Sequence, residues 1–126
     1  MTGRTRPGLD YVLALYRQAG STHASYTHPR IRRAAADIIS RINGLLATPE
    51  PSGYSESARR VEDSKDLAVM AEVLSGAIVD VLGDTSPLLP VANEGLGLLA
   101  DYARDCEAAD VSLRAAIHEA ELLRAA

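Results

Sequence analysis

The sequence contains no Phe and no Trp, one Cys and one Lys. Because five Tyr are its only aromatic residues, a folded core has to be built mainly from Leu, Ile, Val and Ala. The single cysteine, Cys106, leaves no second thiol for an intramolecular disulfide, and its spacing puts it on the apolar side of a helix. We expect a reduced, buried thiol in a reducing compartment, which is the cytoplasm or a phage particle assembled there.

Several motifs of catalysis and cofactor binding are also missing. The chain has no Gly-rich phosphate loop, no nucleophile elbow and no residues at zinc or di-iron spacing. His23 and His28 stand in a polar stretch rich in Ser and Thr, far in sequence from His118. We interpret all three as solvated histidines and expect no catalytic residue, no bound metal and no cofactor.

The chain lacks a segment suited to a membrane. Its longest strongly apolar stretch, residues 67–82, is too short and too acidic to span a bilayer. The apolar run near the N-terminus, residues 9–16, is short, includes Asp10 and does not follow the pattern of a signal peptide. We expect a soluble, cytoplasmic protein with no membrane partner.

Alanine and arginine dominate what is present. Ala occurs 21 times, and Ala is the best helix former and lets helices approach closely. At 126 residues the chain fits one domain. The composition therefore predicts an all-α domain, and the apolar spacing and breaks along the chain predict a four-helix bundle-like single domain over residues 1–126, with a long C-terminal helix. Twelve Arg against one Lys is typical of a GC-rich coding genome, which fits a bacterium or a phage.

Charge divides the chain into two parts. The net charge is −4, but residues 1–47 carry seven Arg and two acids, giving +5, whereas the remainder carries six bases and fifteen acids, giving −9. The Pro- and Gly-containing stretch at 48–53 separates the two parts. We expect an N-terminal arm over 1–8, a basic helical hairpin over 9–47 and an acidic helical hairpin over 55–124.

The basic hairpin is predicted to hold two helices. The first covers about residues 8–18 and stops at Gly20, which is a natural helix terminator. The second begins at Pro29, because proline suits the first helical turn, and ends either at Asn43-Gly44 or near Ala47. Its apolar residues follow the spacing of one helix face: Ile31, Ala35, Ile38, Ile42 and Leu45.

The acidic hairpin is predicted to hold helices near 55–82 and 88–123. The fourth helix would exceed about 45 Å at ~1.5 Å per residue, which is longer than a domain of this size needs. It therefore either breaks near Gly97 or Asp110 or packs partly on another subunit. Its apolar seam is Ala92, Leu96, Leu99, Ala103, Cys106, Leu113, Ile117 and Ala120, widened by Tyr102, Ala109, Ala116 and Leu123.

The third helix contains the stretch around which the chain is organised, residues 67–82. One broad face of it is apolar and is expected to form the core: Leu67, Met70, Ala71, Leu74, Ala77, Ile78, Val81 and Leu82. A second, narrower side is interpreted as an interface with another chain, where a glycine lets a second backbone approach. That side consists of Val69, Glu72, Val73, Gly76, Val79 and Asp80.

The arginines of the N-terminal part form the strongest polar signal. They are Arg4, Arg6, Arg30, Arg32, Arg33 and Arg41. We expect them to bind an anion or a partner, and foremost the acidic half of the same or a neighbouring subunit. The alternative is a nucleic acid bound through residues 1–41, with tyrosines such as Tyr11 and Tyr16 as stacking surfaces.

Acidic residues raise a further alternative. Some all-α nucleotide hydrolases hold Mg²⁺ between carboxylates on adjacent helices, and Glu107 and Asp110 are spaced for such a pair. Glu62, Asp63 and Asp66 would supply the second pair.

Among these alternatives, the sequence favours a non-enzymatic, homo-oligomeric assembly or adaptor protein, such as a phage or bacterial structural component. Its partner would be a second copy of itself or another protein. The runner-up is a nucleic-acid-binding regulator that uses the basic half, and the Mg-dependent nucleotide hydrolase is third.

Overall fold

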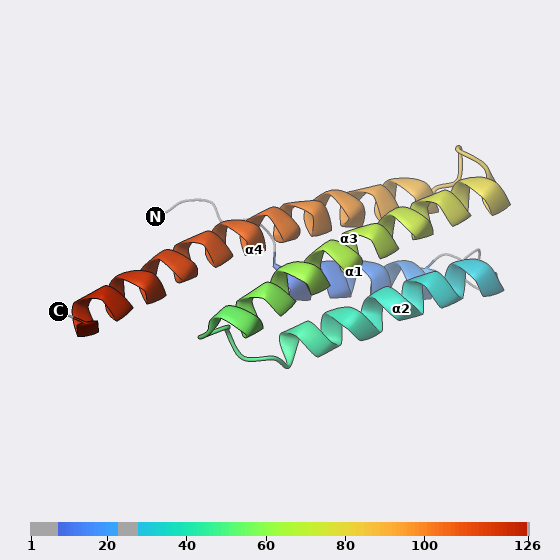
Figure 1. Cartoon of the computed structure of the whole chain (residues 1–126). Helices are drawn as coiled ribbons and strands as arrows, with labels where there is room; N and C mark the ends of the chain where they lie inside the picture. The colour runs from blue at the N-terminus through green and yellow to red at the C-terminus, as the bar shows by residue number, and fades with distance from the viewer. Residues whose placement is uncertain (1–7, 23–27, 126) are drawn as a thin grey trace, which may run out of the picture.

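The computed structural model describes residues 8–22 and 28–125, and these form four helices without any strand. Each helix runs antiparallel to the one before it (Figure 1). The prediction of an all-α helical bundle is confirmed. The helices are α1 (Leu9–Thr22), α2 (Pro29–Leu46), α3 (Tyr54–Leu82) and α4 (Leu88–Ala125).

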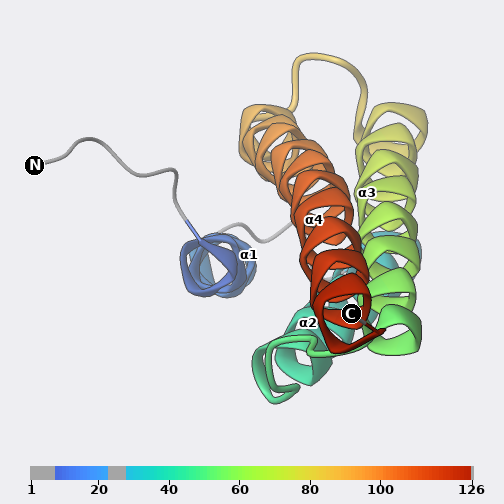
Figure 2. The ribbon, with the colours of Figure 1, turned by 60° about the vertical axis from the view of Figure 1, so that its left-hand side comes forward.

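The helices pack in a cycle in which α1 contacts α2 and α4, while α3 contacts α2 and α4. The most extensive contact joins α3 and α4, which lie side by side along the length of α3 (Figure 2). No helix in the described ranges has the length and apolarity needed to cross a membrane.

The core consists of aliphatic side chains from all four helices together with Tyr16. The five positions predicted from the spacing in α2 are all buried. On α3, the predicted core face is also confirmed, because Leu67, Ala71, Leu74, Ala77 and Ile78 are buried and the other three members are partly buried against the core. Cys106 is buried as expected, with 9% of its surface exposed.

Glycine interrupts the helices less than the sequence suggests. The expected stop at Gly20 is wrong, since α1 runs two residues further to Thr22. The longer alternative holds for α2, which passes through Asn43-Gly44 to Leu46. A glycine inside a helix costs only about 1 kcal/mol relative to Ala, and packing offsets that cost.

Helix ends follow ordinary capping chemistry. Pro29 stands at the start of α2, where the Nδ1 of His28 accepts a hydrogen bond of 3.2 Å from the Arg30 N–H. At the end of α3, Gly83 takes a φ of 89°, a conformation that side chains with a Cβ rarely adopt.

The contact between α1 and α4 depends on a small residue at 95. Tyr16 is 1% exposed, and a Cβ built on Gly95 would lie 2.3 Å from its hydroxyl oxygen. The buried ring of Tyr16 therefore occupies the space that any larger residue at 95 would need. One helical turn away, Tyr11 donates a hydrogen bond of 2.7 Å to Glu94. The interpretation of Tyr16 as a nucleic-acid stacking surface is wrong, because it belongs to the core.

The helices differ greatly in length, from 14 residues in α1 to 38 in α4. The predicted breaks near Gly97 and Asp110 are absent, and at ~1.5 Å per residue α4 is about 57 Å long. It extends well past the beginning of α3 (Figure 1). The bundle therefore tapers toward the C-terminus of α4.

Gly95→Ala should lower the free energy of unfolding by about 1–2 kcal/mol, because overpacking against Tyr16 outweighs the gain in helix propensity. Gly97→Ala is the matched control, since its Cβ would meet nothing within 4 Å and should stabilise the helix by up to about 1 kcal/mol. Urea unfolding measures both. If Gly95→Ala stabilises the protein as Gly97→Ala does, the packing of Tyr16 does not constrain residue 95.

Candidate functional site

The second half of α4, residues 107–125, contains no buried residue, and we call it the α4 extension. It is not polar: Val111, Leu122 and Leu123 expose 68%, 59% and 72% of their surfaces. A helix that only projects into water is expected to be polar all round. The α4 extension instead presents large aliphatic side chains that no helix of the described chain covers.

The apolar residues of the α4 extension lie on more than one side. Ala109, Leu113, Ala116, Ala120 and Leu123 are spaced 4-3-4-3, which places them along one face. We call this face the open stripe. Val111, Ala115 and Leu122 lie on the side away from it. Apolar residues on two sides of one helix were predicted for α3, and this distribution is more pronounced in the α4 extension.

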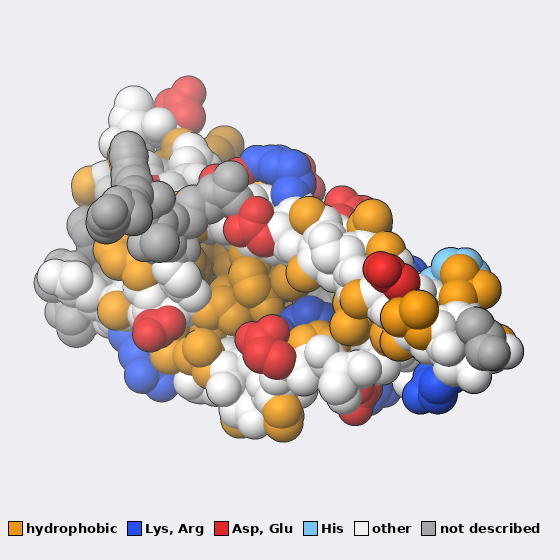
Figure 3. Space-filling model, turned by 90° about the vertical axis from the view of Figure 1, so that its left-hand side faces the viewer, with side chains coloured by type: hydrophobic (Ala, Val, Ile, Leu, Met, Phe, Trp, Pro, Cys, Tyr) orange, Lys and Arg blue, Asp and Glu red, His pale blue; other side chains and the backbone are white. Residues whose placement is uncertain are grey.

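The open stripe continues the side of α4 on which α1 packs. Gly95, Tyr102, Ala109, Ala116 and Leu123 follow one another at intervals of seven residues, so they face nearly the same direction. The first of them contacts Tyr16 of α1, but α1 begins at Leu9 and does not reach the later ones. Viewed from the side of the molecule where α4 ends, hydrophobic side chains gather in a hollow of the molecular surface (Figure 3).

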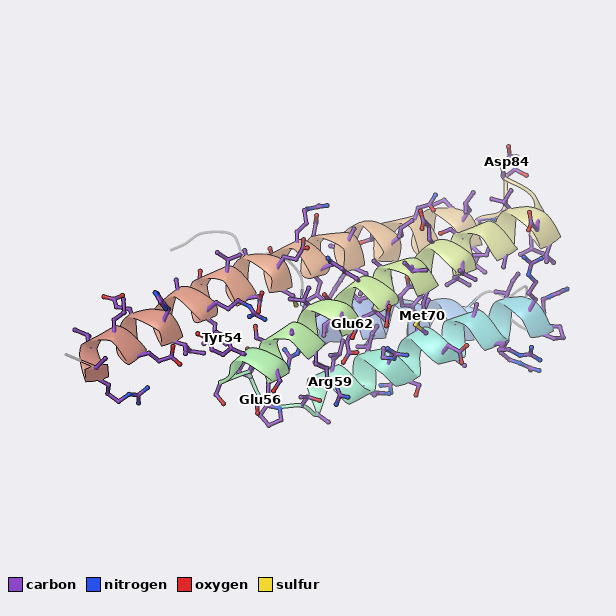
Figure 4. All side chains as sticks on the ribbon, in the orientation of Figure 1. Tyr54, Glu56, Arg59, Glu62, Met70 and Asp84 are labelled. Atoms are coloured by element: carbon purple, nitrogen blue, oxygen red, sulfur yellow. The ribbon has the colours of Figure 1, made fainter. Side chains whose placement is uncertain are left out.

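A polar cluster joins the beginning of α3 to the α4 extension. The Ser57 hydroxyl donates a hydrogen bond of 2.6 Å to Asp110, and the Arg114 Nε donates to both oxygens of the same carboxylate at 3.0 Å. The Arg114 guanidinium lies 5.2 Å from the ring centre of Tyr54, which points from α3 toward α4 (Figure 4). These bonds explain why the apolar seam contains an aspartate at 110.

The same bonds determine the acidity of Asp110. The Ser57 hydroxyl, and after it the Arg114 guanidinium, hold the pKa of Asp110 below its ordinary value of 3.8. The carboxylate is therefore stabilised in its charged form by the contact between α3 and α4.

The predicted interface on α3 is exposed. Its valines, Val69, Val73 and Val79, expose 56%, 57% and 43% of their surfaces, and Gly76 has nothing within 4 Å of the position of a Cβ. Within the described chain no second backbone approaches Gly76, so the close approach expected there would have to come from another molecule. We call this surface, with Glu72 and Asp80, the α3 outer face.

Two of the predicted anion- or partner-binding arginines contact the acidic half of the same chain. Arg30 forms an ion pair of 3.1 Å with Asp80, and Arg41 lies 3.9 Å from both Asp63 and Asp66. Both arginines are therefore directed at α3, as expected. Because these side chains remain largely exposed, each pair contributes little to stability.

Of the other four predicted anion- or partner-binding arginines, two lie in the described chain. Arg32 and Arg33 are exposed on α2, and among the residues that the structure describes no ion pair involves them. Arg4 and Arg6 lie outside the described residues.

Most of the carboxylates proposed for a magnesium site form ion pairs with basic side chains instead. Glu107 forms an ion pair of 2.8 Å with Lys65, and Asp110 is bound by Arg114, while Asp63 and Asp66 face Arg41. Across residues 8–22 and 28–125, no three His, Cys, Asp or Glu side chains come together in a way that could hold a metal ion. The hydrolase alternative gains no support from this geometry.

A groove of about 510 Å³ lies beside the α2–α3 loop. Arg41, Arg59 and Arg60 line it together with three acids, Glu50, Glu56 and Asp63. Arg60 donates hydrogen bonds to the carbonyls of residues 48 and 49, so it holds the loop in place. With equal numbers of opposite charges, the groove shows no preference for an anion.

No protein-family model, curated protein or solved structure matches this chain. Functional reasoning therefore starts from its own residues.

The low pKa of Asp110 predicts a pH dependence of stability. Since the folded-state pKa lies below the unfolded one, the stabilisation is complete above pH 3.8 and is lost as the pH falls below that value toward the folded-state pKa. Asp110→Asn should thus lose less stability than the wild type between about pH 5 and about pH 3. Urea unfolding at both pH values measures the difference.

The matched control is Asp84→Asn, because Asp84 is exposed on the turn between α3 and α4 (Figure 4). It should show the same acid dependence as the wild type. Equal acid sensitivity of Asp110→Asn and the wild type would contradict the role given to the Ser57 and Arg114 bonds.

Proposed function

We propose that this protein is a non-enzymatic helical assembly or adaptor component that acts by self-association through exposed helix faces. The observation that carries the proposal is the α4 extension, with its uncovered Val111, Leu122 and Leu123. Contiguous apolar surface on a soluble helix is the usual sign of a protein partner.

The α3 outer face offers a second contact of the same kind. Val69 and Val73 lie one helical turn apart and are both more than half exposed. Gly76 follows one turn later and leaves room for a neighbouring backbone. A chain with two separate apolar faces can join more than one neighbour, which is what a structural component of a bacterial or phage assembly requires.

Within the described chain, the nucleic-acid alternative draws support from exposed arginines of the basic half that form no ion pair, namely Arg17, Arg32 and Arg33. Arg30 and Arg41 already face carboxylates of α3, and a phosphate would have to displace those acids. An overall charge of −4 also opposes approach to a polyanion. Self-association is therefore the function that the geometry supports best.

Light scattering coupled to size exclusion tests the proposal on the full chain. The wild type should have a mass well above the 13.4 kDa of one chain, and high salt should change that mass little, because apolar contacts are not screened. Val73→Glu should reduce the mass while leaving the helical circular dichroism unchanged. Ala36→Glu, on an exposed position of α2, is the control and should keep the wild-type mass.

A wild-type monomer at all concentrations, with salt-sensitive DNA binding, would overturn the proposal in favour of the nucleic-acid regulator. If the wild type is an oligomer and Val73→Glu keeps its mass, the α3 outer face is not part of the contact and assembly uses the α4 extension.

A further inference from the structure

We propose that the occupant of the open stripe is the open stripe of a second copy of this chain, packed antiparallel about a twofold axis near His118. The inference rests on the proposed function and adds the partner, the orientation and the register. It is carried by the residues of the stripe, which complement one another when the sequence is run in the opposite direction.

Apolar complementarity fixes the register. With the axis near His118, Leu113 of one copy lies opposite Leu123 of the other, and Ala116 lies opposite Ala120. Symmetry makes each of these contacts twice. The alanines at the centre let the two helix backbones approach closely, and the leucines at both ends fill the wider space. Ala109, Ala116, Ala120 and Leu123 are exposed, and Leu113 is partly buried, so the surface is available in the single chain.

The charges agree with this register to within about 3 Å, the rise of two helical residues. Asp110 and Arg124 flank the stripe on the same edge and are 14 residues apart, or two heptads. In the antiparallel arrangement, each Arg124 comes near Asp110 of the second copy, which is also bound by Ser57 and Arg114 of its own chain. A parallel arrangement puts this edge of the two helices on opposite sides of the pair, so it would bring no Arg124 near Asp110 of the other copy.

Access to the stripe agrees with this orientation. The beginning of α3 occupies one side of α4 at Asp110 and Arg114, through Ser57 and Tyr54. The open stripe instead continues the side on which α1 packs against Gly95. A second helix on this side would take the place that α1, starting at Leu9, leaves empty in the described chain. Each copy would thereby extend the other's tapered bundle.

A matched pair of substitutions tests the face. Ala116→Glu places a carboxylate at the centre of the stripe and should raise the dimer dissociation constant at least about a hundredfold, because two charges are buried near the axis. Ala115→Glu is the control: it changes the neighbouring exposed alanine on the far side of the helix and should leave association unchanged. Analytical ultracentrifugation measures both constants.

Disulfide trapping tests the orientation, in a background in which the native thiol is removed by Cys106→Ala. Mixing Leu113→Cys with Leu123→Cys should give a cross-linked heterodimer under mild oxidation. Each variant alone should stay uncrosslinked, since the antiparallel register separates identical positions by about 15 Å. Circular dichroism confirms that the variants keep their helices.

The alternative outcomes are distinct. Cross-linking of each cysteine variant with itself would show a parallel pair and overturn the proposal. An oligomer that survives Ala116→Glu and gives no cross-link would overturn it as well, while leaving self-association through the α3 outer face intact. A wild-type monomer would overturn the proposed function itself.

Discussion

A helix can bury an apolar stripe only where another helix runs beside it, and this constraint governs the whole molecule. Because the four helices have unequal lengths, α1 covers only the beginning of α4, and α3 covers it as far as Asp110 and Arg114. The apolar spacing of α4 does not stop there. The mismatch between the length of the stripe and the length of its neighbours leaves aliphatic side chains of α4 exposed.

Charged residues arrange the helices more than they stabilise them. Arg30 and Arg41 on α2 face acids of α3, and Lys65 of α3 faces Glu107 of α4. These pairs are mostly exposed, so each contributes little to stability. Their common pattern nevertheless favours one neighbour for each helix over the others. The opposite charges of the two halves of the sequence are thus matched, in part, within one chain.

The fold could be predicted to the extent that it depends on periodicity. The spacing of Ile31 to Leu45 and the broad face around Leu74 gave the helices, their buried sides and the exposure of Val73 correctly. Periodicity could not predict whether a glycine ends a helix or is required by close packing, because this depends on contacts with residues distant in the sequence. Gly95 is required by Tyr16, 79 positions earlier, whereas Gly20 only slightly weakens a helix that continues past it.

The candidate site was found in part. The length of the fourth helix left open either a break or packing on another subunit, and the interface was predicted on α3, because nothing in a single sequence shows where neighbouring helices end. A helix break near Asp110 was one of the alternatives predicted from the sequence. In the structure the helix continues through Asp110, whose carboxylate is bound by Ser57 and Arg114. The uninterrupted heptads of Ala109 to Leu123 were the available signal, and only the structure shows that α1, which begins at Leu9, does not extend along them.

The abundance of alanine in the open stripe has a consequence for how firmly two chains can hold together. An alanine side chain has no rotamers to lose, so ordering the stripe against a partner costs little conformational entropy. It also removes little apolar area from water, so the gain on contact is modest. Association through such a surface is readily reversed, and its extent follows the local concentration of the protein.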